Sequence, residues 1–247
     1  MTRRRYRSAG WIHLGLALSI LTVPFLAHGQ EQGPGYISVR FAAVKPGEVA
    51  QFEAAIKDIG EALRAGGSPF FHVYQRIRGE QGYTIISLDG AYNNNLPQIE
   101  LAPALIQRVT ATLNSTSLLT LAIYPEIGIA SGSLEPAGNF MYVRVRTTSP
   151  ANREAYFEWQ RDELVPALQQ AGLNDRRAGR LVAGGNVNTF VEFTYSNEFQ
   201  GNLDIAGTVG QRRFEQIIAR GDALTASAED FRYRFRRDLS FTAPPQQ

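Results

Sequence analysis

The chain has 247 residues, a formal net charge of +2, 44% hydrophobic residues and no cysteine. Such a composition excludes a disordered or fibrous protein and gives room for one large or two ordinary domains. The lack of cysteine excludes disulfides, thiolate metal ligands and thiol nucleophiles.

Residues 1–29 have the features of a secretory signal peptide. Four arginines within the first seven residues precede an apolar run at 11–26, and Ala-His-Gly at 27–29 is a small-residue cleavage pattern before Gln30. The run is shorter than the roughly 20 residues that cross a bilayer. We therefore predict cleavage, export to the periplasm or beyond the cell, and no stable membrane anchor afterwards. The arginines also resemble a twin-arginine signal, so the export route stays open.

The charge and histidine content of the mature chain exclude two classes of partner. Removal of the four leader arginines leaves 21 basic against 23 acidic residues. A nucleic-acid partner is therefore not expected, because phosphate binding needs an excess of basic side chains on one surface. His72 is the one histidine outside the leader, so we predict no metal site and no cofactor.

An internal repeat organises the rest of the chain. Residues 36–40 align with 140–144, Pro46 with Pro150, and Thr84 with Thr189, at an offset of 104 to 105. The repeat predicts a first domain at 30–127, a linker at 128–138, a second domain at 139–241 and a tail at 242–247.

The first unit predicts the order strand, helix, strand, strand, helix, strand. Apolar residues alternate along the first strand and recur at helical spacing between Pro46 and Gly66. The expected elements are a strand at 36–44, a helix to Gly66, strands at 69–78 and 82–89, a helix at 97–113 and a strand at 118–124.

The second unit repeats this order. Ser149 and Pro150 supply an N-cap and a first-turn residue for its first helix. The expected elements are a strand around Val143, a helix to about Gln170, strands at 176–183 and 187–196, a helix at 207–220 that ends at Gly221, and a strand at 231–236; 197–205 are left as a loop.

This order is the ferredoxin-like βαββαβ arrangement, an α+β fold. With its strand-Pro-helix opening, the chain resembles the dimeric α-β barrel superfamily over residues 35–241. That superfamily includes antibiotic-biosynthesis-monooxygenase-like, EthD-like and NIPSNAP-like domains. The resemblance implies that two ferredoxin-like sheets pack face to face, here as two tandem units that form a pseudo-dimer within one chain.

Strand alternation divides the side chains between the helices and the space between the sheets. We expect apolar residues to face the helices: Val39, Val73, Ile86, Leu121, Val143, Val191, Tyr233 and Phe235. The other face would then line a cavity. Guanidinium and phenol groups there predict a site for an organic anion, formed by Tyr36, Arg40, Tyr142, Arg144, Arg180, Glu192 and Arg234.

Three functions follow from these residues. The first is binding of a small anionic organic molecule in the cavity between the sheets. The second is a cofactor-independent monooxygenase-like or isomerase-like reaction with His72 as base, assisted by Tyr74 and Arg76. The third is a structural or interaction protein of the cell envelope whose cavity is closed by ion pairs. Chlorite-dismutase-like haem proteins also use pairs of ferredoxin-like units, and they bind the haem iron through a histidine of the second unit. The second unit of this chain contains no histidine.

Overall fold

The computed structural model describes residues 35–88, 99–129, 138–199 and 204–243, which belong to one compact unit. The predicted signal peptide, most of the predicted linker and the last four residues lie outside the described residues. The predicted cleavage site is therefore left as a prediction.

The first half of the described chain has the predicted order of elements. Alternating side chains form its strands, and apolar residues at helical spacing bury one face of its first helix. The elements are β1 (Gly35–Val44), α1 (Val49–Ala65), β2 (Phe70–Arg76), β3 (Gly82–Leu88), α2 (Pro103–Ala111) and β4 (Leu113–Ile123), followed by the short helix η1 (Pro125–Ile127).

The second half follows the same order, with its first helix divided into segments. Pro150 opens that helix after the Ser149 cap, which accepts a hydrogen bond from the Asn152 amide. The elements are β5 (Phe140–Thr148), η2 (Pro150–Asn152), α3 (Arg153–Trp159), η3 (Gln160–Leu164), α4 (Val165–Gln170), β6 (Arg176–Ala183), β7 (Thr189–Ser196), α5 (Ile205–Val209), α6 (Gln211–Ala223), β8 (Thr225–Phe235), η4 (Arg237–Leu239) and β9 (Phe241–Thr242).

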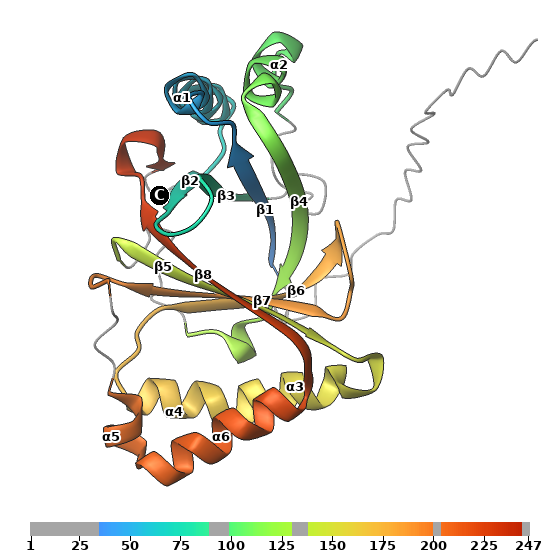
Figure 1. Ribbon diagram of the computed structural model, residues 1–247, viewed down its shortest axis with the longest axis vertical. Helices are drawn as coiled ribbons and strands as arrows, with labels where there is room; N and C mark the ends of the chain where they lie inside the picture. Colours follow the sequence, from blue (N-terminus) through green and yellow to red (C-terminus); the bar gives the residue numbers. More distant parts are fainter. Residues whose placement is uncertain (1–34, 89–98, 130–137, 200–203, 244–247) are drawn as a thin grey trace, which may run out of the picture. The chain divides into compact units, whose positions relative to one another are not determined.

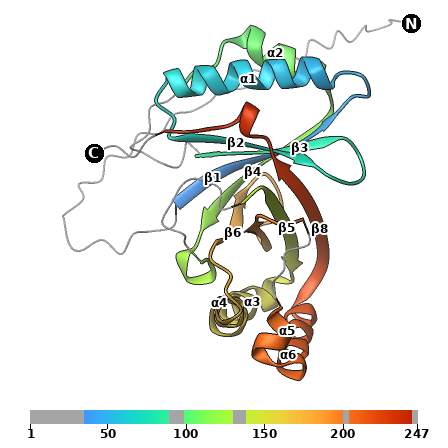
Figure 2. The ribbon, with the colours of Figure 1, turned by 90° about the vertical axis from the view of Figure 1, so that its left-hand side faces the viewer.

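The described strands form one antiparallel sheet that closes on itself. Its order is β3-β1-β4-β6-β7-β5-β8-β2-β9, and β2 also pairs with β3. Each half contributes four neighbouring strands, and β4–β6 and β8–β2 pairings join the halves. Helices α1 and α2 cover one side of this barrel and α3 to α6 the opposite side (Figures 1 and 2).

Apolar side chains fill the barrel interior. Strands β1 to β8 all contribute to one buried cluster, which an eight-stranded barrel is just wide enough to hold. Separate clusters lie beneath the helices of each half. The buried residues of the interior are Ile37, Val39, Phe70, Tyr74, Ile86, Leu121, Met141, Val143, Leu181, Val191, Phe193, Tyr195 and Tyr233.

The predicted strand faces are therefore wrong for most strands. Seven residues expected to face the helices point into the barrel: Val39, Ile86, Leu121, Val143, Val191, Tyr233 and Phe235. Val73 packs under the helices as predicted. The reason is that closure of the barrel excludes water from its whole interior, whereas each helix layer covers only part of the outer face of the sheet. The apolar stripe consequently faces inward, and the polar stripe lies beneath or beside the helices.

The boundaries of several elements also differ from the sequence prediction: α2 begins at Pro103 rather than at 97, and Gly210 divides the predicted helix at 207–220 into α5 and α6. Strands β4 and β8 begin five and six residues earlier than predicted. Their first halves are exposed and lack an apolar stripe, so the sequence pattern did not indicate them as strand. Helix α6 continues past Gly221, whose missing Cβ leaves room for the Trp159 ring; a Cβ there would lie 2.3 Å from Cζ2 of that ring. Glycine in this helix serves packing rather than termination.

Among the described residues, no helix combines the length and the apolar character that a membrane span requires. The same residues contain no group of three or more His, Asp or Glu side chains placed to hold a metal ion.

Candidate functional site

Three cavities border the residues singled out in the sequence. The first, the Arg40 cavity, has a volume of about 290 Å³ and lies between the sheet and the helices α1 and α2. The second, the Arg144 cavity, has about 550 Å³ and lies in the corresponding place under α4 to α6. The third, the barrel opening, has about 450 Å³ and lies between the two halves.

The floor of the Arg40 cavity combines a polar patch with the apolar side chains Phe71, Ile85 and Leu118, and its roof is largely apolar. Ser38 and Ser87 are direct partners across β1 and β3, and Arg40 follows on the same face of the sheet. The roof comes from the inward faces of α1 and α2. Apolar residues that line the cavity are Ile56, Ile59, Leu63, Phe71, Ile85, Leu101, Ile106, Val109, Leu113 and Leu118.

Among the described residues that line this cavity, Arg40 is the one that carries a charge, and it is half-buried. Burial lowers the pKa of its guanidinium, because the charged form loses solvation. Within residues 35–88, 99–129, 138–199 and 204–243, Arg40 makes no ion pair or hydrogen bond from its side chain. The cavity therefore holds a positive charge without a protein counter-charge in the described part of the chain.

The equivalent residue of the second half, Arg144, is in a different electrostatic environment. Its neighbours across the flanking strands are Glu192 on β7 and Asp230 on β8. The Nε atom of Arg144 lies 3.9 Å from Oδ1 of Asp230. For Arg40 the corresponding cross-strand neighbours are the apolar Ile85 and Leu118.

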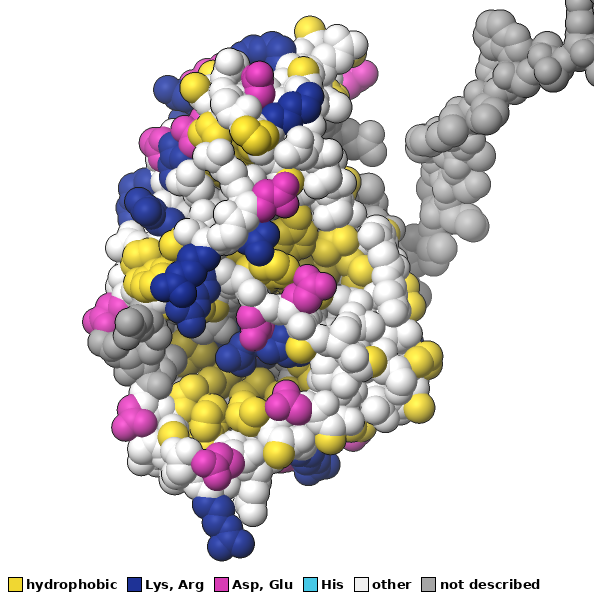
Figure 3. Space-filling model, viewed as in Figure 1, with side chains coloured by type: hydrophobic (Ala, Val, Ile, Leu, Met, Phe, Trp, Pro, Cys, Tyr) yellow, Lys and Arg dark blue, Asp and Glu magenta, His cyan; other side chains and the backbone are white. Residues whose placement is uncertain are grey.

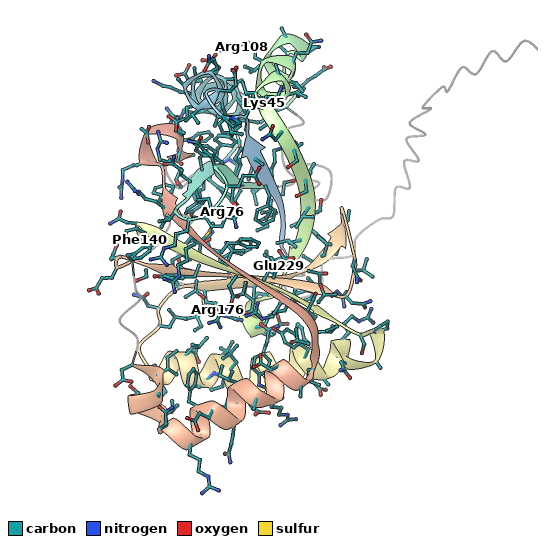
Figure 4. All side chains as sticks on the ribbon, in the orientation of Figure 1. Lys45, Arg76, Arg108, Phe140, Arg176 and Glu229 are labelled. Atoms are coloured by element: carbon teal, nitrogen blue, oxygen red, sulfur yellow. The ribbon has the colours of Figure 1, made fainter. Side chains whose placement is uncertain are left out.

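A buried network occupies the floor beside Arg144. Glu192 accepts a hydrogen bond from Tyr156 at 2.8 Å and pairs with the guanidinium of Arg176 at 3.0 Å. Arg176 also donates to Oε1 of Gln160 at 2.7 Å and to the carbonyl of Ile127. Burial alone would raise the pKa of Glu192, but Arg176 and Arg144 lower it, so the carboxylate is ionised. Figure 4 shows Arg176 between the sheet and the lower helices.

The barrel opening carries charges of both signs. Figure 4 shows Arg76 on the side of β2 and Glu229 on β8, and Figure 3 shows apolar side chains in the hollow between the halves. The guanidinium of Arg76 lies over the Phe231 ring, 4.9 Å from its centroid. Phe41, Leu119 and Val145 also line this opening.

The three predicted catalytic residues share the interior face, as expected, but they do not form one site. His72 lies between Phe70 and Phe235, and its Nε2 is 2.9 Å from Oγ1 of Thr242. Tyr74 is fully buried, and burial raises the pKa of its phenol. Arg76 alone of the three lines a cavity described above.

The predicted ligand residues are divided among several places. Arg40 lines the first cavity, whereas Tyr142 and Arg144 line the second. Glu192 is held by Arg176 and Tyr156. Of the remaining three, Arg180 lies 5.9 Å from the Tyr124 ring centroid, Arg234 is exposed, and Tyr36 is opposite Ala122 on β4; none lines the three cavities bordered by described residues.

Sequence reasoning missed two elements of the Arg40 cavity. The apolar roof, with Ile106 on α2, and Leu118 on β4 were not included among the candidate residues. Ile106 lies within the predicted helix, but its partner across the cavity depends on the strand register. Pairing of Leu118 with Arg40 is visible only once β4 is known to begin at Leu113.

Comparison with solved structures supports the fold. The chain is similar to a proposed monooxygenase from Fusobacterium nucleatum, with a TM-score of 0.62, 13% identity, and coverage of 83% of this chain and 93% of that chain. A proposed monooxygenase from Lactobacillus acidophilus gives a TM-score of 0.58, 14% identity, and coverage of 85% and 96%. An anthrone oxidase-like protein gives 0.58, 10% identity, and coverage of 86% and 94%.

These likenesses, at 10–14% identity, show a shared α+β fold with a large antiparallel sheet, and membership of the dimeric α-β barrel superfamily stays a prediction. No protein-family model matches the chain, and no curated protein matches it. A shared fold does not identify a function, so the cavities and their side chains carry the functional information.

Proposed function

We propose that this protein binds a small organic anion in the Arg40 cavity. The observation that carries the proposal is the contrast between two equivalent arginines. Arg144 has Glu192 and Asp230 as cross-strand neighbours, whereas Arg40 has Ile85 and Leu118. The sequence prediction placed the anion between the sheets; the helix side is favoured instead because the interior is filled and Arg40 faces outward.

A bound carboxylate would compensate the cost of burying Arg40. A guanidinium that loses water without gaining a partner is unfavourable, and a bidentate carboxylate restores both charge and hydrogen bonds. The neighbouring Ser38 and Ser87 place hydroxyl groups on the same floor. Such a site discriminates anions from neutral molecules of the same shape.

Replacement of Arg40 is the direct test. We expect Arg40→Met to weaken binding of 3-phenylpropionate at least tenfold, because a hydrogen-bonded charge contributes about 1.5 to 3 kcal/mol. Arg144→Met is the matched control and should bind like the wild type. Isothermal titration calorimetry at pH 7 measures both affinities; equal weakening by the two substitutions would contradict the proposal.

A second pair of variants tests the charge argument without removing Arg40. Leu118→Asp gives Arg40 the carboxylate neighbour that Asp230 gives to Arg144, at a position that is 46% exposed. Leu118→Asn has nearly the same shape and no charge. Binding should be weaker in the aspartate variant than in the asparagine variant; equal affinities would show that Arg40 does not hold the anion.

We also propose that the two halves are tandem copies of one unit and that the mature protein is exported. The nearly constant sequence offset and the matching strand order of the halves support the duplication. The leader pattern at residues 1–29 supports export. Mass spectrometry of the processed protein tests the latter, since cleavage would leave Gln30 as the first residue.

An enzymatic use of the cavity is the second candidate, because two proteins with this fold are proposed monooxygenases. His72 is poorly placed for this reaction, since it lies in the core and outside the three cavities. Oxygen consumption that depends on a bound acid and is lost in Arg40→Met would support this alternative. Stable binding without turnover would favour a binding protein.

A further inference from the structure

The apolar roof of the Arg40 cavity restricts what an anionic ligand can be. Ile56 and Ile59 of α1 and Val109 of α2 face the sheet above Arg40. A second charged group held beneath α1 and α2 would lie against these side chains without a partner. Burial of an unpaired charge is strongly unfavourable. The cavity therefore favours a molecule with one anionic group.

Exposed apolar side chains gather at the same cavity. Ile106 and Leu118 are 49% and 46% exposed, and both line it. Among the described residues the third large hydrophobic side chain with such exposure, Val187, lies in the turn between β6 and β7. Apolar surface that is gathered at a cavity is a feature of binding sites, because a ligand can remove it from water.

The cavity volume limits the size of the ligand. At roughly 30 Å³ for each water-sized group, a volume of about 290 Å³ holds about ten non-hydrogen atoms. Two exposed contacts connect α2 to its neighbours above this space: Arg108 of α2 pairs with Asp58 of α1 at 2.7 Å, and Nζ of Lys45 donates to the carbonyl of Ala111 at 2.7 Å. Figure 4 shows Lys45 and Arg108 beside these helices.

We infer that the ligand is an amphipathic monocarboxylate of about ten non-hydrogen atoms, of the class of medium-chain fatty acids and arylalkanoic acids. This inference rests on the proposed function and specifies its ligand. The carboxylate binds Arg40 in the polar patch of the floor, and the apolar body lies under α1 and α2, where it covers Ile106 and Leu118.

A ligand series tests the class. Octanoate has the expected size and a single charge, octanedioate adds a second carboxylate, octanol removes the charge, and acetate removes the apolar body. By calorimetry with the mature protein, we expect octanoate to bind at least tenfold more tightly than each of the other three. Octanedioate or acetate binding as tightly as octanoate through Arg40 would overturn the class but leave anion binding intact. Absence of binding by every acid would overturn both.

Matched variants of exposed apolar residues test the role of the roof. Ile106→Ser should weaken octanoate binding several-fold and leave acetate binding unchanged, because only the longer ligand reaches this side chain. Val187→Ser removes an equally exposed hydrophobic residue elsewhere and should have no effect on either ligand. Equal octanoate affinity in the two variants would contradict an apolar body under α2.

Discussion

Replacement of Glu192 with alanine is expected to lower the free energy of unfolding by about 3 to 5 kcal/mol, the range found when one member of a buried ion pair is removed. Arg176 is 1% exposed and Glu192 3% exposed, and the two side chains pair at 3.0 Å. The substitution would leave the Arg176 cation buried and the Tyr156 hydroxyl without its acceptor. Urea denaturation at pH 7 measures the loss.

Two comparisons separate this effect from simple loss of a side chain. Asp162→Ala removes the partner of Arg161 in an exposed ion pair and should leave stability close to that of the wild type. The double substitution Arg176→Met with Glu192→Leu removes both charges and should recover much of the loss, because no buried ion is left without a partner. A double variant as unstable as Glu192→Ala would show that the loss of stability comes from packing and not from the unpaired Arg176 cation.

The buried pair also gives the two equivalent arginines different surroundings. Glu192 lies opposite Arg144 in the sheet and contributes to its electrostatic environment. In the first half the same sheet position is Ile85, which packs into the core beneath α1 and α2. One half thus places an ionised carboxylate beside its arginine, and the other places apolar side chains there, the difference on which the proposed anion site depends.

The order of elements could be predicted from the sequence because it depends on local patterns. Alternation along 36–44 and helical spacing after Pro46 are properties of neighbouring residues, and β1 and α1 confirm them. The first halves of β4 and β8 were missed for the same reason. Residues 114–118 are exposed, so their strand conformation depends on pairing with β1 and not on their own pattern.

The strand faces could not be predicted from local patterns. Alternation divides Val39 from Arg40 but does not tell which of them faces inward. That choice depends on closure of the barrel by the β4–β6 and β8–β2 pairings, which join segments far apart in the chain. Arg40 was a candidate from the sequence, but its distinguishing neighbours, Ile85 and Leu118, become visible only with the strand register.

His72 is expected to make the folded protein less stable as the pH falls. Burial, and secondly the positive charge of Arg177, lower its pKa in the folded state from 6.5 to about 3. The unfolded chain therefore takes up a proton below about pH 6.5 that the folded protein does not accept until about pH 3. Within that interval, protonation of His72 in the unfolded chain lowers the free energy of unfolding by about 1.4 kcal/mol for each pH unit.

The variant His72→Gln isolates this contribution, since glutamine is neutral and keeps a group able to bond Thr242. Between pH 7 and pH 4.5, urea denaturation should show the wild type losing about 2.7 kcal/mol more than the variant, from two pH units below 6.5. Binding of 3-phenylpropionate at pH 7 should be unchanged, because His72 lies outside the Arg40 cavity. Parallel pH dependence in the two proteins would instead mean that His72 accepts a proton in the folded state. It would then return to consideration as the base of a catalysed reaction.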